Sequence, residues 1–344
     1  MENNLFKYAT KELSQDAFLC YLFSFGKDKT TLPYPIVQNI LKYLNVQGEI
    51  KSIKRQENKI DVLVLTDKCA LIIEDKINTG EHDRQIETYR SKIHQKYENL
   101  EVIVAYVKTG FLSEQEQRYL QRYKQLYKDK FFILKGQDLL YYIGSPDKYN
   151  DLIIKQWTQW QQLGQNEIQQ AKKKIEERWK ELEFSALPSI LEKNIYLDTI
   201  TQYIREYTQF TDSSWWMASG RTPHIELQTH CIQDFERQLQ YSTSAYMTFA
   251  KKEFSLIIKQ HIFPFVGDRI KIKDYDPAMR ARLAAQCEQM YCENKQHNWG
   301  WHETPGKTGE KLTVLEKKFS MAQQIDKCVV SETKAISSLL GSVK

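Results

Sequence analysis

Three charged residues interrupt two segments of the chain that are otherwise apolar. The first segment, residues 60–66, carries Asp61, and the second, residues 69–77, carries Glu74 and Lys76. Both segments are rich in Ile, Val and Leu, which is typical of β-strands. Because a charge on a buried strand is costly unless it is paired or bound to a metal, these three residues are candidates for a functional site.

The spacing of the two strands predicts how these side chains meet. If residues 67–68 form a two-residue hairpin loop, Asp61 lies directly opposite Glu74, with Cβ atoms about 4.5–5.5 Å apart. Side chains alternate between the faces of a strand, so Lys76 projects on the same face as Glu74. Two opposed carboxylates repel each other, and a divalent cation such as Mg²⁺ would neutralise them. A register slip of one residue would instead put the two acids on opposite faces.

The flanking segments alternate between helical and strand-like patterns, and this order predicts an α/β fold with a mixed sheet. Helices are expected at residues 5–25, 36–44, 84–97 and 114–128, and strands at residues 49–56, 60–66, 69–77, 101–107 and 131–134.

Asp61 and, thirteen positions later, the triplet Glu74-Asp75-Lys76 resemble the core motif of the PD-(D/E)XK nuclease superfamily. The opening NLFKYATKELSQDAF is similar to the first helix of a bacterial branch of that superfamily. Further along, Gln85 and Tyr89 match the QxxxY element that follows the ExK strand in RecB-like members. The resemblance covers about residues 5–135. It implies a restriction-endonuclease-like mixed central β-sheet flanked by helices.

The resemblance also implies roles for individual residues in a metal-dependent nuclease. Asp61 and Glu74 would bind Mg²⁺ or Mn²⁺ through their carboxylates, and the backbone carbonyl of Asp75 would be a further ligand. Glu12, on the first helix, would supply another acid to the metal. Lys76 would orient or activate the attacking water and stabilise the charge that develops on the phosphate.

Gln85 and Tyr89 would support this chemistry, Gln85 by positioning the water or a phosphate and Tyr89 by supporting Lys76 or the backbone. Each assignment has a structural alternative. Asp61 and Lys76 could form an ion pair on a solvated sheet face. Glu12 could be an exposed acid that the helix dipole favours. Gln85 and Tyr89 could be ordinary residues of an amphipathic helix.

The composition changes after residue 150, where residues 155–184 are rich in Gln, Lys, Glu and Trp and are expected to form a connecting helix. We therefore expect a nuclease-like domain at 1–150, a helical connector at 151–187 and an α+β C-terminal domain at 188–344, which would recognise substrate or a trigger or form oligomers. The C-terminal elements expected are a helix at 190–207, a strand at 214–228 and a helix at 277–291.

Composition excludes some classes of protein and permits others. The 344 residues include 49 Lys and Arg against 44 Asp and Glu, a net charge of +5 that permits nucleic acid as a partner without requiring it. No apolar run is long enough to span a membrane, the N-terminus lacks a signal-peptide pattern, and the six cysteines form no CxxC pair. We therefore expect a cytoplasmic protein.

Three hypotheses of function follow from the sequence. The first is an Mg²⁺-dependent nuclease that hydrolyses phosphodiester bonds of nucleic acid, with DNA as the expected substrate. Its context would be restriction, repair or anti-phage defence, as a homo-oligomer or with a partner protein of a defence system. The second is a catalytically inactive module on the same fold that binds nucleic acid or protein. The third is a scaffold protein built around the polar helix at residues 155–184.

Overall fold

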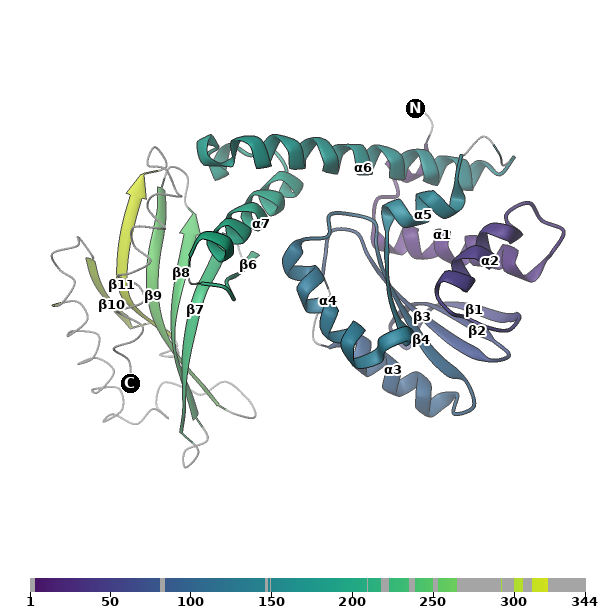
Figure 1. Ribbon diagram of the computed structural model, residues 1–344, viewed down its shortest axis with the longest axis horizontal. Helices are drawn as coiled ribbons and strands as arrows, with labels where there is room; N and C mark the ends of the chain where they lie inside the picture. The colour runs from purple at the N-terminus through teal and green to yellow at the C-terminus, as the bar shows by residue number, and fades with distance from the viewer. Residues whose placement is uncertain are drawn as a thin grey trace. The chain divides into compact units, whose positions relative to one another are not determined.

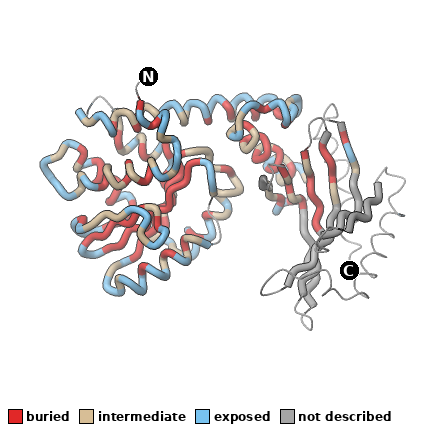
Figure 2. The backbone as a smooth tube through the Cα atoms, turned by 180° about the vertical axis from the view of Figure 1, so that it is seen from behind, coloured by how far each residue is buried: buried red, intermediate tan, exposed pale blue. Residues whose placement is uncertain are grey.

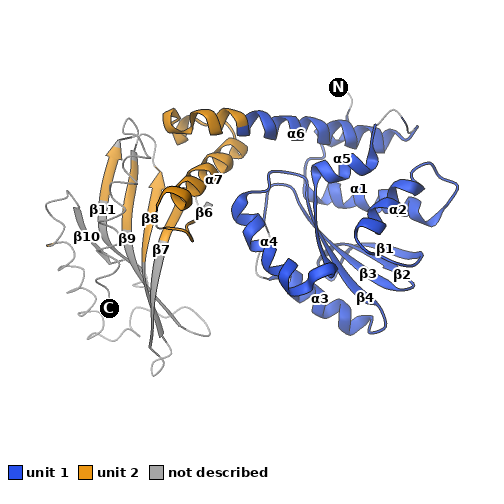
Figure 3. Cartoon of the chain, in the orientation of Figure 1, with its two compact units in different colours: residues 1–172 blue, residues 173–344 orange. Residues whose placement is uncertain are grey.

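The computed structural model of the chain divides into two compact units, residues 1–172 (unit 1) and residues 173–344 (unit 2), coloured separately in Figure 3. The helix expected at residues 277–291 lies outside the described residues. The structure describes residues 4–80, 84–145, 148, 150–208, 210–217, 223–234, 239–249, 253–264, 292, 300–305 and 311–320.

Unit 1 is built on a five-stranded mixed sheet in the order β1-β2-β3-β4-β5. Strands β1 to β3 form an antiparallel meander, whereas β3, β4 and β5 run parallel to one another. Parallel neighbours need a crossover, and a helix lies in each of the two crossovers. The strands are β1 Ile50–Glu57, β2 Ile60–Thr66, β3 Cys69–Lys76, β4 Glu101–Lys108 and β5 Phe131–Lys135.

Helices cover both faces of this sheet (Figure 1). One face carries α1 (Glu12–Ser24), α2 (Tyr34–Tyr43) and α5 (Gly136–Ile143), and the other carries α3 (Gln85–Lys96) and α4 (Glu114–Tyr127). This arrangement confirms the predicted restriction-endonuclease-like fold class. The short helix α5 was not predicted.

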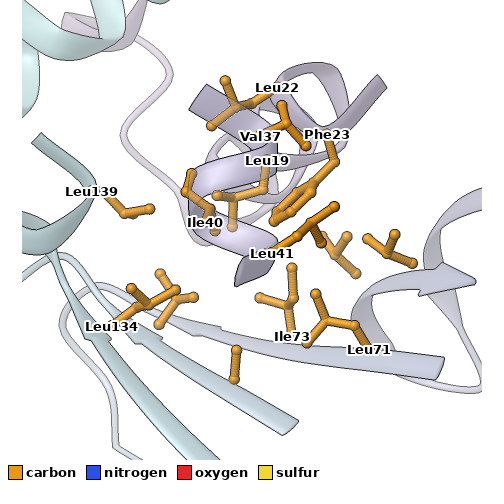
Figure 4. Close-up of a cluster of buried hydrophobic side chains, with 14 of the residues drawn as sticks. Leu19, Leu22, Phe23, Val37, Ile40, Leu41, Leu71, Ile73, Leu134 and Leu139 are labelled. Carbon is orange, nitrogen blue, oxygen red and sulfur yellow. The ribbon is translucent and has the colours of Figure 1, made fainter. Parts of the chain in front are cut away.

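The two faces of the sheet have separate apolar cores. Leu19 of α1 and Ile40 of α2 pack toward Leu71 and Ile73 of β3 (Figure 4). On the opposite face, side chains of α3 and α4 cover the alternate residues of the same strands. Strands β2 to β4 are therefore buried along nearly their whole length (Figure 2), which explains why they read as continuous apolar runs.

The helix expected at residues 5–25 is divided in the structure. A 3₁₀ turn, Leu5–Lys7, comes first, and the Asn4 side chain caps it by accepting a hydrogen bond from the Phe6 N–H. The chain then becomes extended at Lys11 (φ −83°, ψ 154°), and α1 begins only at Glu12. The predicted start was wrong because the spacing of apolar residues gives no sign of the extended residue Lys11. The observed start places Glu12 in the first turn of α1.

Helix α6, Leu152–Arg178, occupies most of the segment expected as a connector. Its first half contributes to the core of unit 1, where the Trp157 ring stacks on Phe18 with centroids 4.3 Å apart. Gln161 and Gln165 each donate a side-chain hydrogen bond of 2.8 Å to the carbonyl oxygen of Thr109, which follows β4. The expected domain boundaries stay a prediction.

Unit 2 combines a helix with an antiparallel sheet, as expected of an α+β unit. Helix α7, Ile190–Tyr207, has the predicted bounds. The strand expected at residues 214–228 is instead two strands, β6 and β7, which pair with each other. In the described part of unit 2 the sheet has the order β10-β11-β9-β8-β7-β6. The strands are β6 Ser214–Met217, β7 Pro223–Asp234, β8 Leu239–Phe249, β9 Glu253–Pro264, β10 Gly300–Pro305 and β11 Lys311–Ser320.

Candidate active site

The hairpin of β2 and β3 has the predicted register. Val62 pairs with Ile73 and Leu65 with Ala70, so the same register extended by one residue sets Asp61 opposite Glu74. The Thr66 hydroxyl holds the tight loop by accepting hydrogen bonds from the backbone N–H groups of residues 68 and 69, at 3.1 and 2.7 Å. This side-chain support allows a two-residue loop without the Asn-Gly or Asp-Gly pair that such loops favour.

Glu74 and Lys76 form a buried ion pair on β3. Lys76 Nζ lies 2.5 Å from Glu74 Oε1, and the two residues are 7% and 1% exposed. Burial by itself lowers the pKa of Lys76, but the charges of Glu74 and then Asp61 outweigh it, so the pKa lies above its ordinary value. Lys76 is therefore a cation at neutral pH. As a cation it can donate hydrogen bonds and stabilise negative charge.

Asp61 is held by a backbone group of the neighbouring strand. Its Oδ2 accepts a hydrogen bond of 2.9 Å from the backbone N–H of Asp75, and its Oδ1 accepts one of 3.1 Å from Gln56 Nε2. The same Gln56 Nε2 donates to Oδ2 of Asp16 on α1, at 2.8 Å. One amide therefore bridges the carboxylates of β2 and α1.

The side chain of Asp75 points to the face of the sheet opposite Glu74, as strand alternation requires. There Gln15 of α1 donates a short hydrogen bond to Asp75 Oδ1. The Asp75 side chain is therefore paired with α1. On the same face the side chains of Asp75 and Asp16 form a hydrogen bond with each other.

Crowding of carboxylates shifts their protonation. Burial, followed by the charge of Asp61, raises the pKa of Asp16 to about 6. Burial also raises the pKa of Asp75 well above its ordinary value, and the charges of Asp16 and Asp61 add to this. Asp16 and Asp75 therefore hold their protons more strongly than ordinary Asp side chains do.

Glu12 reaches the end of β3 from the first turn of α1. Its Oε1 accepts a hydrogen bond of 3.0 Å from the Ile77 backbone N–H and one of 2.7 Å from the Thr79 hydroxyl. Its charge is among those that raise the pKa of Lys76. Glu12 therefore anchors the backbone immediately after Lys76, which differs from the simple exposed acid considered as its alternative.

Gln85 and Tyr89 lie on one face of α3 and contact each other, with Gln85 Nε2 donating to the Tyr89 hydroxyl at 3.3 Å. Burial, and then the charges of Glu74 and Asp61, raise the pKa of Tyr89. The Tyr89 hydroxyl therefore lies near the carboxylates of Glu74 and Asp61.

The donor chemistry of this site fits a hard divalent cation, because the β2–β3 register sets the carboxylates of Asp61 and Glu74 opposite each other and carboxylate oxygens are the ligands that such cations prefer. Among the described residues, no three His, Cys, Asp or Glu side chains are already arranged as a metal site. A cation held by Asp61 and Glu74 would therefore take its other oxygens from backbone carbonyls and water.

Some residues of the site were not found from the sequence. Asp16 could have been, because it lies four residues after Glu12 and so on the same face of α1. Gln15 and Gln56 carry no such signal, since their partners are brought to them by the packing of α1 against the sheet.

Comparison with known proteins agrees with this geometry. The family model of the PD-(D/E)XK nuclease superfamily matches residues 2–209, which is more than half of the chain and includes every site residue named above. Neither a curated protein nor a solved structure matches the chain. Within the described part of the chain, every helix is too short or too polar to span a bilayer.

Proposed function

Since the chain belongs to the PD-(D/E)XK nuclease superfamily, we propose that it is a metal-dependent nuclease that hydrolyses phosphodiester bonds of DNA. One observation carries the proposal: Lys76 is buried, charged and paired with Glu74 at 2.5 Å, at the end of β3 that Asp61 reaches from β2. Acids and a lysine so close together on a buried sheet are expensive for stability alone.

Two carboxylates and a carbonyl would hold the cation. We assign Asp61, Glu74 and the backbone carbonyl of Asp75 to Mg²⁺ or Mn²⁺, and Glu12 as an additional acid near them. Oxygen ligands of this kind suit hard cations. When bound, such a cation polarises a phosphate oxygen and lowers the pKa of bound water.

The remaining residues act by position and charge. Lys76, kept protonated by its acidic neighbours, would donate a hydrogen bond that orients the attacking water and would stabilise negative charge on the phosphate. Gln85 would position the water or a phosphate oxygen, and Tyr89 would hold Gln85 through the hydrogen bond between them.

The biological setting is a further part of the proposal. We propose that unit 2 selects the substrate, a trigger or a partner protein, and that the enzyme serves in restriction, repair or anti-phage defence in the cytoplasm. The net charge of +5 is compatible with nucleic acid as substrate, and bound cations would add positive charge that the formal count omits.

The test is cleavage of supercoiled plasmid, linear duplex DNA, single-stranded DNA and RNA with Mg²⁺, Mn²⁺ or EDTA. We expect cleavage of DNA that EDTA abolishes. Lys76→Ala should lower the rate by about 10²-fold or more, because it removes a charge aimed at the reacting phosphate. Lys68→Ala is the matched control, because Lys68 is exposed in the loop of the same hairpin.

Two results would contradict the mechanism: cleavage that persists in EDTA, and full activity of Lys76→Ala. Binding of DNA without cleavage under all conditions would favour the inactive binding module. Preferential cleavage of RNA would keep the chemistry and correct the substrate.

A further inference from the structure

A second buried lysine lies beside Lys76. Lys108, the last residue of β4, pairs with Lys76 in the parallel register of β3 and β4 and is only 2% exposed. Burial lowers the pKa of Lys108, and the positive charge of Lys76 lowers it further, while Glu116 offsets part of the shift. Because an apolar side chain would fill this space without the cost of a buried charge, the ammonium group needs an explanation.

Two contacts hold the ammonium group of Lys108 from the side of α4. It lies 3.1 Å from both Oε1 and Oε2 of Glu116. Glu116 is held in turn by the Tyr106 hydroxyl, which donates to Oε1 at 2.5 Å, and by the Ser113 hydroxyl, which caps α4 by accepting from the Glu116 N–H. Lys108 is thus a fixed donor and not a mobile one.

The third contact of Lys108 leads to the candidate site. Its Nζ donates a short hydrogen bond to the carbonyl oxygen of Thr79, in the loop that follows β3. The hydroxyl of the same Thr79 donates to Glu12 Oε1 at 2.7 Å, and that oxygen also accepts from the Ile77 N–H. A continuous hydrogen-bonded path therefore runs from α4 through Lys108 and Thr79 to Glu12 and to the residue next to Lys76.

The backbone reinforces this path. The Thr109 N–H donates to the carbonyl oxygen of Lys76 at 3.1 Å. A Cβ atom added at Gly110 would lie 2.0 Å from the Ile77 carbonyl oxygen, so only glycine allows the two strand ends to approach so closely. The end of β4 thus holds the end of β3 in place at Ile77 and at Lys76, which the proposed reaction uses.

We propose that Lys108 is a positioning residue for the nuclease reaction, which fixes Glu12 and the end of β3 through Thr79. The proposal rests on the proposed function and deepens it. Lys108 does not contact substrate, because its side chain is buried and its donors are occupied. It acts by setting the geometry in which Glu12 and Lys76 meet the cation and the phosphate.

The experiment compares full-length wild type with Lys108→Met, which keeps the unbranched side chain as far as Cε and removes the ammonium group. We expect kcat for DNA cleavage to fall by about 10–100-fold with KM for DNA unchanged. In calorimetric titrations without DNA, the affinity for Mn²⁺ should fall by about tenfold, since Glu12 loses its fixed position. Hydrogen exchange of residues 74–80 should become faster.

Two further variants separate positioning from folding. Thr79→Val keeps the carbonyl that Lys108 binds and removes the hydroxyl that binds Glu12, and because Thr79 is exposed the variant should fold normally. It should lower kcat and Mn²⁺ affinity in the same direction as Lys108→Met. The matched control is Lys130→Met, because Lys130 forms an exposed ion pair with Glu101 at the start of β4, and this variant should match wild type in all measurements.

The proposal is overturned if folded Lys108→Met keeps the kcat and the Mn²⁺ affinity of wild type. It is also overturned if Lys108→Met loses activity only in proportion to its unfolded fraction while Thr79→Val is fully active. If wild type cleaves nothing, the proposed function fails separately. Mn²⁺ titration and hydrogen exchange then still decide whether Lys108 positions this end of the sheet.

Discussion

Asp16 is the residue of the site whose burial most directly lowers the free energy of unfolding. It is 1% exposed, its Oδ2 accepts a hydrogen bond from Gln56, and it lies near the charge of Asp61. A carboxyl group in such a place prefers to be protonated, and its pKa of about 6 expresses this preference. In the unfolded chain the same group would ionise near its ordinary pKa of 3.8.

The pH dependence of stability follows from this difference. Well below pH 3.8 the group is protonated in both states. As the pH rises from about 4 to about 6, the unfolded state gains stability by ionising while the folded state does not, so the free energy of unfolding falls. We expect Asp16→Asn, which cannot ionise, to be more stable than wild type above about pH 6, by on the order of 1 kcal/mol after solvent screening.

Thermal unfolding in EDTA at about pH 4 and about pH 8 measures this effect. The stability that Asp16→Asn gains over wild type should be present at the higher pH and small at the lower pH. A difference that does not change with pH, or a variant less stable than wild type at about pH 8, would contradict the assigned protonation. Glu167→Gln is the control, because Glu167 is an exposed acid on α6.

At the scale of elements, the close approach of β3 and β4 at their ends is the feature that positions the site. Gly110→Ala would force the added methyl group against the Ile77 carbonyl oxygen, which belongs to the backbone and cannot move away cheaply. We expect a loss of about 1–3 kcal/mol in the free energy of unfolding, together with lower activity, because the strand ends must separate.

Gly164→Ala is the matched substitution with the opposite expected sign. Gly164 lies in α6, and a Cβ atom added there would meet nothing within 4 Å. Alanine in a helix interior is favoured over glycine, so this variant should gain about 0.5–1 kcal/mol. Urea denaturation of both variants measures the two changes in the free energy of unfolding. A Gly110→Ala protein as stable as wild type would contradict the close approach of the ends of β3 and β4.

At the scale of the whole molecule, helix α6 extends unit 1 beyond residue 150. The ring of Trp157 stacks on Phe18, the Asn4 side chain donates to the Gln156 carbonyl, and Gln161 donates to the Thr109 carbonyl. These contacts tie α6 to the N-terminus, to α1 and to the end of β4. A fragment that stops at residue 150, the boundary expected from composition, lacks all of them.

We therefore expect a fragment of residues 1–178 to fold cooperatively and a fragment of residues 1–150 to fold poorly or not at all. Circular dichroism and urea unfolding would compare the two, and the tryptophan fluorescence of the longer fragment, which comes from Trp157 and Trp160, would report whether α6 is packed. A stable, cooperative 1–150 fragment would show that α6 is dispensable and would support the boundary expected from composition.

Much of unit 1 could be predicted because its elements follow from patterns among residues that are close together in the sequence. Apolar strands, helical spacing and the two-residue hairpin loop together predict the order of elements and the register that sets Asp61 opposite Glu74. The spacing of Gln85 and Tyr89 likewise predicts one face of α3. The start of α1 was not predicted correctly, because the extended conformation of Lys11 does not change the spacing of the apolar residues.

The sequence by itself determined which residues carry charge on buried strands, since alternation and loop length specify faces and register before any tertiary contact forms. Tertiary structure alone decided that Glu12 accepts a hydrogen bond from the Ile77 N–H and that Lys108 holds the loop after β3. These contacts join residues of different elements, often far apart in the chain. Only the packing of helices on the sheet decides which donors and acceptors meet in a buried place, and there each polar group must find a partner or shift its pKa.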